Sequence, residues 1–330
     1  MTRDNYLIVA DSEHDANMLY AVDLFIPDPF IFLRLNGKCH IVLNDLEIDR
    51  GRKYSRRCRV LSLSSYVEKL KRSGLRSISC ARVIREILRE HRLKKILVPA
   101  NFPLGLAREL ADLKITVKVK PGSFFPKREF KSAEEIKKIS AALIMAEVGL
   151  AEGIQALKSS KVAKDGRLLY HNLSLTAEKL RSIIDIAIIQ VGGFANHTIV
   201  AAGKQGCDPH ERGSGPLRAN QPIILDVFPR SQKTGYFGDI TRTVVKGRAK
   251  EDVRKLYHTV ARAQDLAFSQ IRHNKSGKEI HRAVEQLFES AGYKTGKRHG
   301  QWRGFSMERA MDWGWSFTKH PASARPLPIS

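Results

Sequence analysis

Two aspartates interrupt apolar, strand-like stretches of the chain. The first lies in Ile223-Ile-Leu-Asp-Val-Phe228 and the second in Thr234-Gly-Tyr-Phe-Gly-Asp-Ile-Thr-Arg-Thr-Val-Val245. A lone carboxylate is costly to bury unless it is paired or bound to a metal. If the two segments are neighbouring strands, Asp226 and Asp239 point to one place, where their oxygens suit Mn, Co or Zn. The alternative is that each aspartate caps a turn or pairs with a basic neighbour such as Arg242.

Helical patterns flank the aspartate segments on both sides. Ser132 and Glu135 form a capping-box pattern that predicts a helix to about Leu157, and apolar spacing after Thr176 predicts a second helix. Residues 198–201 add another strand. Two further helices are expected from the apolar sets Val253, Leu256, Tyr257, Val260 and Ile280, Val284, Leu287, Phe288, the second ending at Gly292.

The first third of the chain alternates strand and helix patterns. Asn36-Gly37 predicts a hairpin with a type I′ turn. The strands are expected at 6–10, 30–35, 39–43, 95–98 and 115–119, and the helices at 81–91 and 104–113. Pro121-Gly-Ser-Phe-Phe-Pro126 reads as a linker. We therefore expect one domain over 1–120, a linker over 121–131 and a second domain over 132–305.

The charge balance raises the question of nucleic acid. The 330 residues include 57 Lys and Arg against 34 Asp and Glu, a net charge of +23. The basic residues occur in both halves and no nucleic-acid-binding motif stands out, so a generally basic solvated surface is the favoured interpretation. The composition fits neither a disordered nor a membrane protein, and no export signal is readable, which predicts a cytoplasmic protein with no membrane partner.

The four cysteines give no metal or redox pattern. Their wide spacing excludes a C-x-x-C pair. We expect four reduced, mostly buried thiols, at positions Cys39, Cys58, Cys80 and Cys207.

The aspartate segments resemble the two-aspartate signature of the pita-bread metallopeptidases. Residues 196–210, which end in His210, and the linker with its preceding α/β unit resemble the Xaa-Pro aminopeptidase and prolidase branch of that family. The resemblance covers most of residues 1–305. It implies an α+β chain in which a creatinase-like α/β N-terminal domain precedes a pita-bread catalytic domain.

The resemblance also implies roles for individual residues. Asp226 would chelate one of two divalent cations (Mn, Co or Zn) and Asp239 would bridge both. His210 would contact a peptide substrate near the scissile bond, unless it holds the loop over 206–215 by a backbone hydrogen bond. Thr241 and Arg242 would orient Asp239 without touching the metal. A homodimer is a further implication of the resemblance. The thirteen positions from Asp226 to Asp239 imply a longer hairpin turn than is usual.

The rest of the family's metal site is not readable. A histidine from an H-G-x-x-H motif and two later glutamates are missing, which makes the catalytic domain incomplete. Met307 to Gly314 can be back-translated and shifted by one base to read His-Gly-Thr-Gly-His-Gly-Leu-Gly, so we expect residues 306–330 to be an out-of-frame tail. The leading interpretation is an impaired metal-dependent Xaa-Pro peptidase. The alternatives are a non-catalytic pita-bread module that binds peptide, RNA or ribosomes, and a metal-free amidinohydrolase, against which both aspartates argue.

Overall fold

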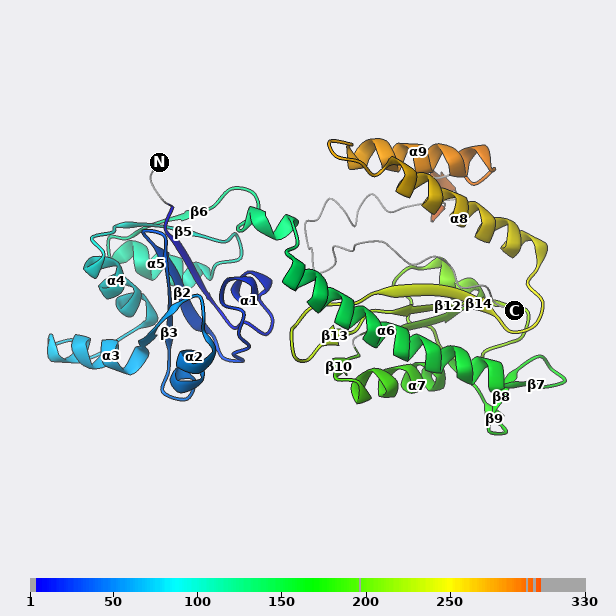
Figure 1. Ribbon diagram of the computed structural model, residues 1–330, viewed down its shortest axis with the longest axis horizontal. Coiled ribbons are helices and arrows are strands. Elements are labelled where there is room, and N and C mark those ends of the chain that lie inside the picture. Colours follow the sequence, from blue (N-terminus) through cyan, green and yellow to red (C-terminus); the bar gives the residue numbers. More distant parts are fainter. Residues whose placement is uncertain (1–3, 196, 295, 299–300, 304–330) are drawn as a thin grey trace. The chain divides into compact units, whose positions relative to one another are not determined.

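The computed structural model divides into two compact units, Met1–Ala133 and Glu134–Ser330 (Figure 1). It describes residues 4–195, 197–294, 296–298 and 301–303. The expected out-of-frame tail, 306–330, lies outside these residues. The mixture of helix and sheet in both units agrees with the predicted α+β class.

A six-stranded mixed sheet forms the centre of the first unit. Its strand order is β4-β3-β2-β1-β5-β6, with the β1–β2 and β2–β3 pairs antiparallel and the other three pairs parallel. The strands are β1 Tyr6–Ala10, β2 Phe30–Leu35, β3 Lys38–Leu43, β4 Arg59–Ser62, β5 Lys95–Val98 and β6 Thr116–Val119. Asn36 and Gly37 both have positive φ, 50° and 83°, as the predicted type I′ turn requires.

Helices cover both faces of this sheet. Leu7, Leu33 and Ile96 contribute to a core with α3, α4 and α5, and the alternate residues Ile8 and Phe32 contribute to a core with α1 and α2. The helices are α1 Ala16–Val22, α2 Ile48–Tyr54, α3 Leu63–Arg72, α4 Cys80–Glu90 and α5 Leu104–Asp112. Sequence patterns predicted α4 and α5 but missed the other three helices and β4.

The segment expected to be a free linker belongs to the first unit. Residues 121–131 fall within its bounds and include a short 3-10 helix, η1 Pro126–Glu129. Phe124 is buried in the core beside α1, and its ring lies 5.2 Å from that of Tyr6, while the ring of Phe125 lies 5.4 Å from that of Tyr20. The two phenylalanines anchor the segment because burial of aromatic rings is strongly favourable.

The cysteine expectation is wrong in two respects. Cys39 on β3 and Cys58, directly before β4, form a disulfide, and Cys80 and Cys207 are exposed rather than buried. The parallel register places His40 opposite Arg59, so the residues directly before them on the two strands, Cys39 and Cys58, are also neighbours. This adjacency arises from strand pairing between segments 19 residues apart and has no local sequence signal.

Two long helices pack on one face of the sheet β11-β12-β14 in the second unit (Figure 1). Thr176 caps the N-terminus of α7 by accepting a hydrogen bond from the amide of Lys179. A Cβ on Gly149 would lie 2.7 Å from Ile188 and one on Gly153 would lie 2.8 Å from Ile184, so the helices approach closely. The elements are α6 Ala133–Ser159, α7 Ala177–Gln190, β11 Ile199–Ala202, β12 Pro222–Val227 and β14 Ile240–Val245.

Smaller elements complete the second unit. A three-stranded sheet joins α6 to α7, a two-stranded ribbon flanks the main sheet, and a helical hairpin follows β14. Their bounds are β7 Lys161–Val162, β8 Leu168–Tyr170, β9 Leu173–Ser174, β10 Gly193–Phe194, η2 Gly203–Cys207, β13 Arg230–Ser231, α8 Glu251–Gln270, α9 Gly277–Ser290, β15 Gly296–Arg298 and β16 Gln301–Arg303.

One helix, α6, is long and apolar enough to cross a membrane when judged by length and composition alone. Ala142, Ala146 and Leu150 on this helix are buried, and Ala146 and Leu150 belong to the core shared with α7 and the sheet. A helix that contributes to a protein core meets the same criterion, so the finding is weak evidence for a membrane span.

Candidate metal and substrate site

Asp226 lies on the more open face of the central strand of the three-stranded sheet. Ile223, Leu225 and Val227 alternate with it and are fully buried against α6 and α7. Asp226 itself is half-buried, because strand alternation turns it away from that core. The carboxylate therefore avoids most of the desolvation cost that its apolar neighbours suggested.

Asp239 is expected on the same face as Asp226. The antiparallel register pairs Asp226 with Thr241, and Asp239 comes two residues before Thr241 along the chain. Ile240, between them, is a paired strand residue, so the side chains of positions 239 and 241 point to one side. Diagonal neighbours of this kind have Cβ atoms roughly 7 Å apart. Strand alternation therefore favours one face for the two carboxylates, and both this convergence and their role as metal ligands stay predictions.

The segment before Asp239 is fixed against α6. A Cβ on Gly238 would lie 2.3 Å from the carbonyl oxygen of Ala142, so only glycine permits this approach. The hydroxyl of Tyr236 donates a hydrogen bond of 3.0 Å to Oε1 of Glu135. Lys138 of the same helix lies 5.6 Å from the centre of the Tyr236 ring. These contacts hold the start of β14 in position.

Thr241 and Arg242 make different contacts from those expected. The hydroxyl of Thr241 donates a hydrogen bond to Oδ1 of Asp226. Arg242 is paired with Leu225, so it lies on the face opposite to that of Asp226, and its guanidinium donates to the carbonyl of Thr241 at 2.9 Å. Thr241 is therefore placed to orient Asp226, and the sequence resemblance had assigned it to Asp239.

His210 is exposed in a loop beside β11. Its backbone amide donates a hydrogen bond of 2.9 Å to Oδ1 of Asp208. Two residues further on, the carbonyl of Arg212 accepts from the amide of Val200 at 3.0 Å. Val200 directly follows Ile199, which is paired with Asp226. His210 thus lies near the strand end that carries Asp226.

The loop that follows His210 is tied to α7 and to β11. A Cβ on Gly213, whose φ is +79°, would lie 1.8 Å from the carbonyl oxygen of Val200. Arg181 of α7 donates to the carbonyl of Gly213 at 3.2 Å. The amide of Gly215 donates to Glu178 at 3.1 Å. Hydrogen bonds lower the pKa of the Glu178 carboxyl below its usual value. The largest effect comes from its own backbone amide, followed by the Thr176 hydroxyl and the Gly215 amide.

The described donors fit divalent cations in kind but not in number. Carboxylate oxygens are the ligands that hard divalent cations prefer. Within residues 4–294 as the structure describes them, however, no group of three His, Cys, Asp or Glu side chains could hold a metal ion. Asp226 and Asp239 alone would leave two cations largely unligated.

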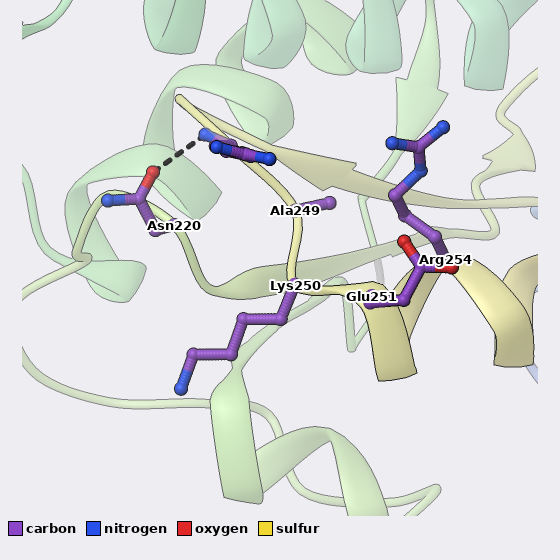
Figure 2. A pocket seen from close by; sticks show the side chains of 6 residues that line it. Asn220, Ala249, Lys250, Glu251 and Arg254 are labelled. Atoms are coloured by element: carbon purple, nitrogen blue, oxygen red, sulfur yellow. Dashed lines mark hydrogen bonds between the residues drawn. The ribbon is translucent and has the colours of Figure 1, made fainter.

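A pocket of about 400 Å³ lies elsewhere, at the N-terminus of α8 (Figure 2). Its lining is mainly polar and charged, and the carboxamide of Asn220 accepts a hydrogen bond of 2.6 Å from the amide of Arg248. Neither predicted metal-binding aspartate lines this pocket. The residues that do are Asn220, Arg248, Ala249, Lys250, Glu251 and Arg254.

Comparison with solved structures shows the fold. The chain superposes on an X-Pro aminopeptidase from Thermotoga maritima with a TM-score of 0.70 and 17% identity, covering 88% of this chain and 76% of that one. The prolidase from Pyrococcus furiosus gives a TM-score of 0.68 at 17% identity, with 88% and 76% covered. The pita-bread architecture predicted from the aspartate segments is therefore confirmed.

Curated relatives are also peptidases. An uncharacterized peptidase, YqhT, of Bacillus subtilis is 28% identical over 55% of this chain and 48% of the relative. An Xaa-Pro dipeptidase of Pyrococcus horikoshii is 24% identical over 66% of this chain and 58% of the relative. The chain thus spans about half the length of the curated relatives it matches. The profile of metallopeptidase family M24 matches residues 137–312, more than half of the chain. The chain therefore belongs to metallopeptidase family M24.

Proposed function

We propose that this chain is an impaired metal-dependent peptidase whose complete form hydrolyses Xaa-Pro peptide bonds. The observation that carries the proposal is the register of β12 and β14, which pairs Asp226 with Thr241, two residues after Asp239. Family membership and the Xaa-Pro dipeptidases among the relatives support the reaction class. A metal-free amidinohydrolase would not need two converging carboxylates.

Each residue of the site has a separate task in this proposal. Asp226 and Asp239 hold two divalent cations, and Thr241 fixes the rotamer of Asp226 through its hydroxyl. His210, exposed beside β11, contacts the peptide near its scissile bond. The cations, when bound, supply a water of lowered pKa and polarise the substrate carbonyl.

The impairment follows from the donor count. Two carboxylates supply too few ligands for a cation pair, and the described residues offer no third donor beside them. The expected histidine would fall within Met307–Gly314 once the frame is shifted. We therefore propose that restoring the reading frame from residue 306 supplies the missing ligands.

A paired assay tests the proposal. The chain as given and the frame-restored chain would be loaded with Mn²⁺, analysed for bound metal, and assayed on Gly-Pro and an Xaa-Pro-Yaa tripeptide. We expect about two bound ions and hydrolysis for the restored chain alone. In the restored chain, Asp226→Asn and Asp239→Asn should each abolish metal binding and activity, whereas Asp265→Asn, on an exposed carboxylate of α8, should change neither.

Each other result would contradict part of the proposal. Hydrolysis by the chain as given would show that its own residues complete the site. Inactivity of both chains, with peptide binding retained, would favour a non-catalytic binding module.

We further propose that the protein is a homodimer located in the cytoplasm. Cell fractionation tests the location, and sedimentation of the restored chain tests the oligomeric state.

A further inference from the structure

A strongly basic surface lies on the first unit, Met1–Ala133. It is formed by α3, the turn after it, α4 and the start of β5. Helices α3 and α4 pack side by side (Figure 1). Residues 69–95 contain only two acidic side chains, against ten basic ones: Lys69, Lys71, Arg72, Arg76, Arg82, Arg85, Arg89, Arg92, Lys94 and Lys95. We call this set the α3–α4 basic surface.

Both acidic residues of this surface are already engaged. Oε1 of Glu86 accepts from Arg89 at 2.7 Å and lies 3.0 Å from Nζ of Lys69. Glu90 accepts from Lys69 at 2.5 Å and from the hydroxyl of Tyr66 at 2.8 Å. Arg72 lies 3.7 Å from Glu68. Seven cations have no ion-pair partner among the residues that the structure describes, namely Lys71, Arg76, Arg82, Arg85, Arg92, Lys94 and Lys95.

The helix geometry aligns part of this charge. Arg82, Arg85 and Arg89 follow one another at spacings of three and four, which places them on one face of α4. The opposite face, with Ile84 and Ile87, is buried in the core. Arg82 and Arg89 are separated by about 10 Å along the helix axis, at 1.5 Å per residue. That distance corresponds to about three base pairs of a duplex.

We propose that the α3–α4 basic surface binds the phosphate backbone of a nucleic-acid duplex. Arginine guanidinium groups match phosphate oxygens in a two-pronged geometry, and four of the seven unpaired cations are arginines. Sequence order suggested scattered basic residues, but folding packs α3 against α4 and so gathers the cations of these two helices on one face of the sheet. Their local excess, ten cations against three carboxylates when Glu68 of α3 is counted, is larger than the general basic balance of the chain implies.

The uncharged side chains of this surface argue against other anionic partners. The large apolar side chains exposed on the first unit, among the described residues, all lie outside α3 and α4: Leu46, Tyr54, Leu104, Val119 and Phe130. A membrane-binding helix would present such side chains for insertion. Binding of single strands relies on exposed aromatic rings for base stacking, and Tyr66 of α3 is engaged with Glu90. A duplex is the partner that requires cations alone.

Salt-dependent binding of the full chain tests the proposal. A fluorescent duplex of about 20 base pairs would be titrated by anisotropy between 50 and 300 mM salt, with the unlabelled single strand and phosphatidylserine vesicles as competitors. The plot of log K against log salt has a negative slope. The double variant Arg82→Gln/Arg85→Gln should make that slope less steep by about two. At 0.1 M salt this corresponds to roughly 50-fold weaker binding. Arg262→Gln/Arg282→Gln removes the same charge from exposed positions of α8 and α9 and should leave binding unchanged.

Several outcomes would overturn the proposal. No duplex binding by the unmodified chain would end it. Equal weakening by both double variants would show that net charge, rather than the α3–α4 basic surface, attracts the duplex. Stronger competition by the single strand or by vesicles would identify a different partner. Both double variants should unfold at the same temperature as the wild type. This control shows that weaker binding reflects lost contacts rather than unfolding.

Discussion

The hydroxyl of Thr241 donates a hydrogen bond to Oδ1 of Asp226 across the antiparallel pair β12–β14. The contact joins two strands at the predicted ligand Asp226, two residues along β14 from the predicted ligand Asp239. A carboxylate whose second oxygen is to bind a cation must keep a fixed rotamer, and a neighbouring hydroxyl provides that restraint. Thr241 therefore links the sheet register to the proposed ligand geometry.

Thr241→Val in the frame-restored chain should weaken Mn²⁺ binding by about 10- to 100-fold, because the side chain keeps its shape and loses only its hydroxyl. Isothermal titration calorimetry measures the change. Thr243→Val is the matched control, since Thr243 lies on the same face of β14, opposite Ile224. Equal weakening by both substitutions would mean that strand packing, and not the hydrogen bond to Asp226, controls metal affinity.

Gly213→Ala should destabilise the second unit more than Gly215→Ala does. Both glycines have positive φ, +79° and +76°, so each substitution carries a backbone cost of about 1 kcal/mol. Only at Gly213 would the new Cβ meet another group, the carbonyl oxygen of Val200 at 1.8 Å. We expect an additional loss of about 2 kcal/mol or more in the free energy of unfolding.

Denaturant titration of both glycine variants measures that difference. The comparison isolates the clash because the strain from positive φ is shared. If Gly215→Ala were equally destabilising, the close approach between the His210 loop and β11 would not be a source of stability.

The sequence predicted which faces of the elements are apolar, but not what covers them. The apolar set that predicted the helix α8 does not mark its buried face, because Leu256, Tyr257 and Val260 are 44%, 52% and 42% exposed. The helix instead buries Thr259 and Ala263. Helical periodicity defines a stripe of side chains, whereas its partner is another part of the chain.

Long-range pairing explains the other differences. The predicted hairpin, the strand of Asp226 and most helices rest on local patterns of turn residues and periodicity, and these were confirmed, whereas the second aspartate strand begins only at Ile240, after Asp239. The contact of Thr241 with Asp226 depends on strand register, and the neighbourhood of Cys39 and Cys58 depends on the parallel pairing of β3 with β4. Neither the register nor this pairing leaves a signal within a short window of sequence.

The Cys39–Cys58 disulfide should stabilise the first unit by about 3 kcal/mol, because it closes a loop between residues 19 positions apart. Cys39→Ser/Cys58→Ser should lower the unfolding temperature of the oxidised chain to that of the reduced wild type. Cys80→Ser/Cys207→Ser, which removes the two exposed cysteines, is the control and should leave it unchanged. Four titratable thiols in the oxidised, denatured wild type, instead of two, would contradict the pairing. In a reducing cytoplasm the bond would be open.

Glu86 should make the first unit sensitive to acid. Hydrogen bonds from Arg89, and further contacts with Lys69, lower the pKa of Glu86 to about 2. A carboxylate whose pKa is lower in the folded state contributes its stabilisation above the unfolded value, near 4.5, and loses it as the pH falls toward 2. The side chain of Glu86 is 9% exposed, but those of Arg89 and Lys69 are 68% and 48% exposed, so solvent screens part of the contacts.

Unfolding free energies of the wild type and Glu86→Gln should therefore differ most at pH 6 and converge between pH 4.5 and 2. The difference at pH 6 should reach about 1 to 2 kcal/mol, because solvent screening by the exposed cations reduces the full effect of the pKa shift. Glu68→Gln is the control, since that carboxylate is 67% exposed and forms only the long contact with Arg72. A wild-type-to-variant difference that stays constant across this pH range would show that the charge of Glu86 does not contribute to folding. The charged form of Glu86 stabilises the fold because it lies between two cations, Lys69 and Arg89. Without that negative charge the two cations would repel each other where α3 packs on α4.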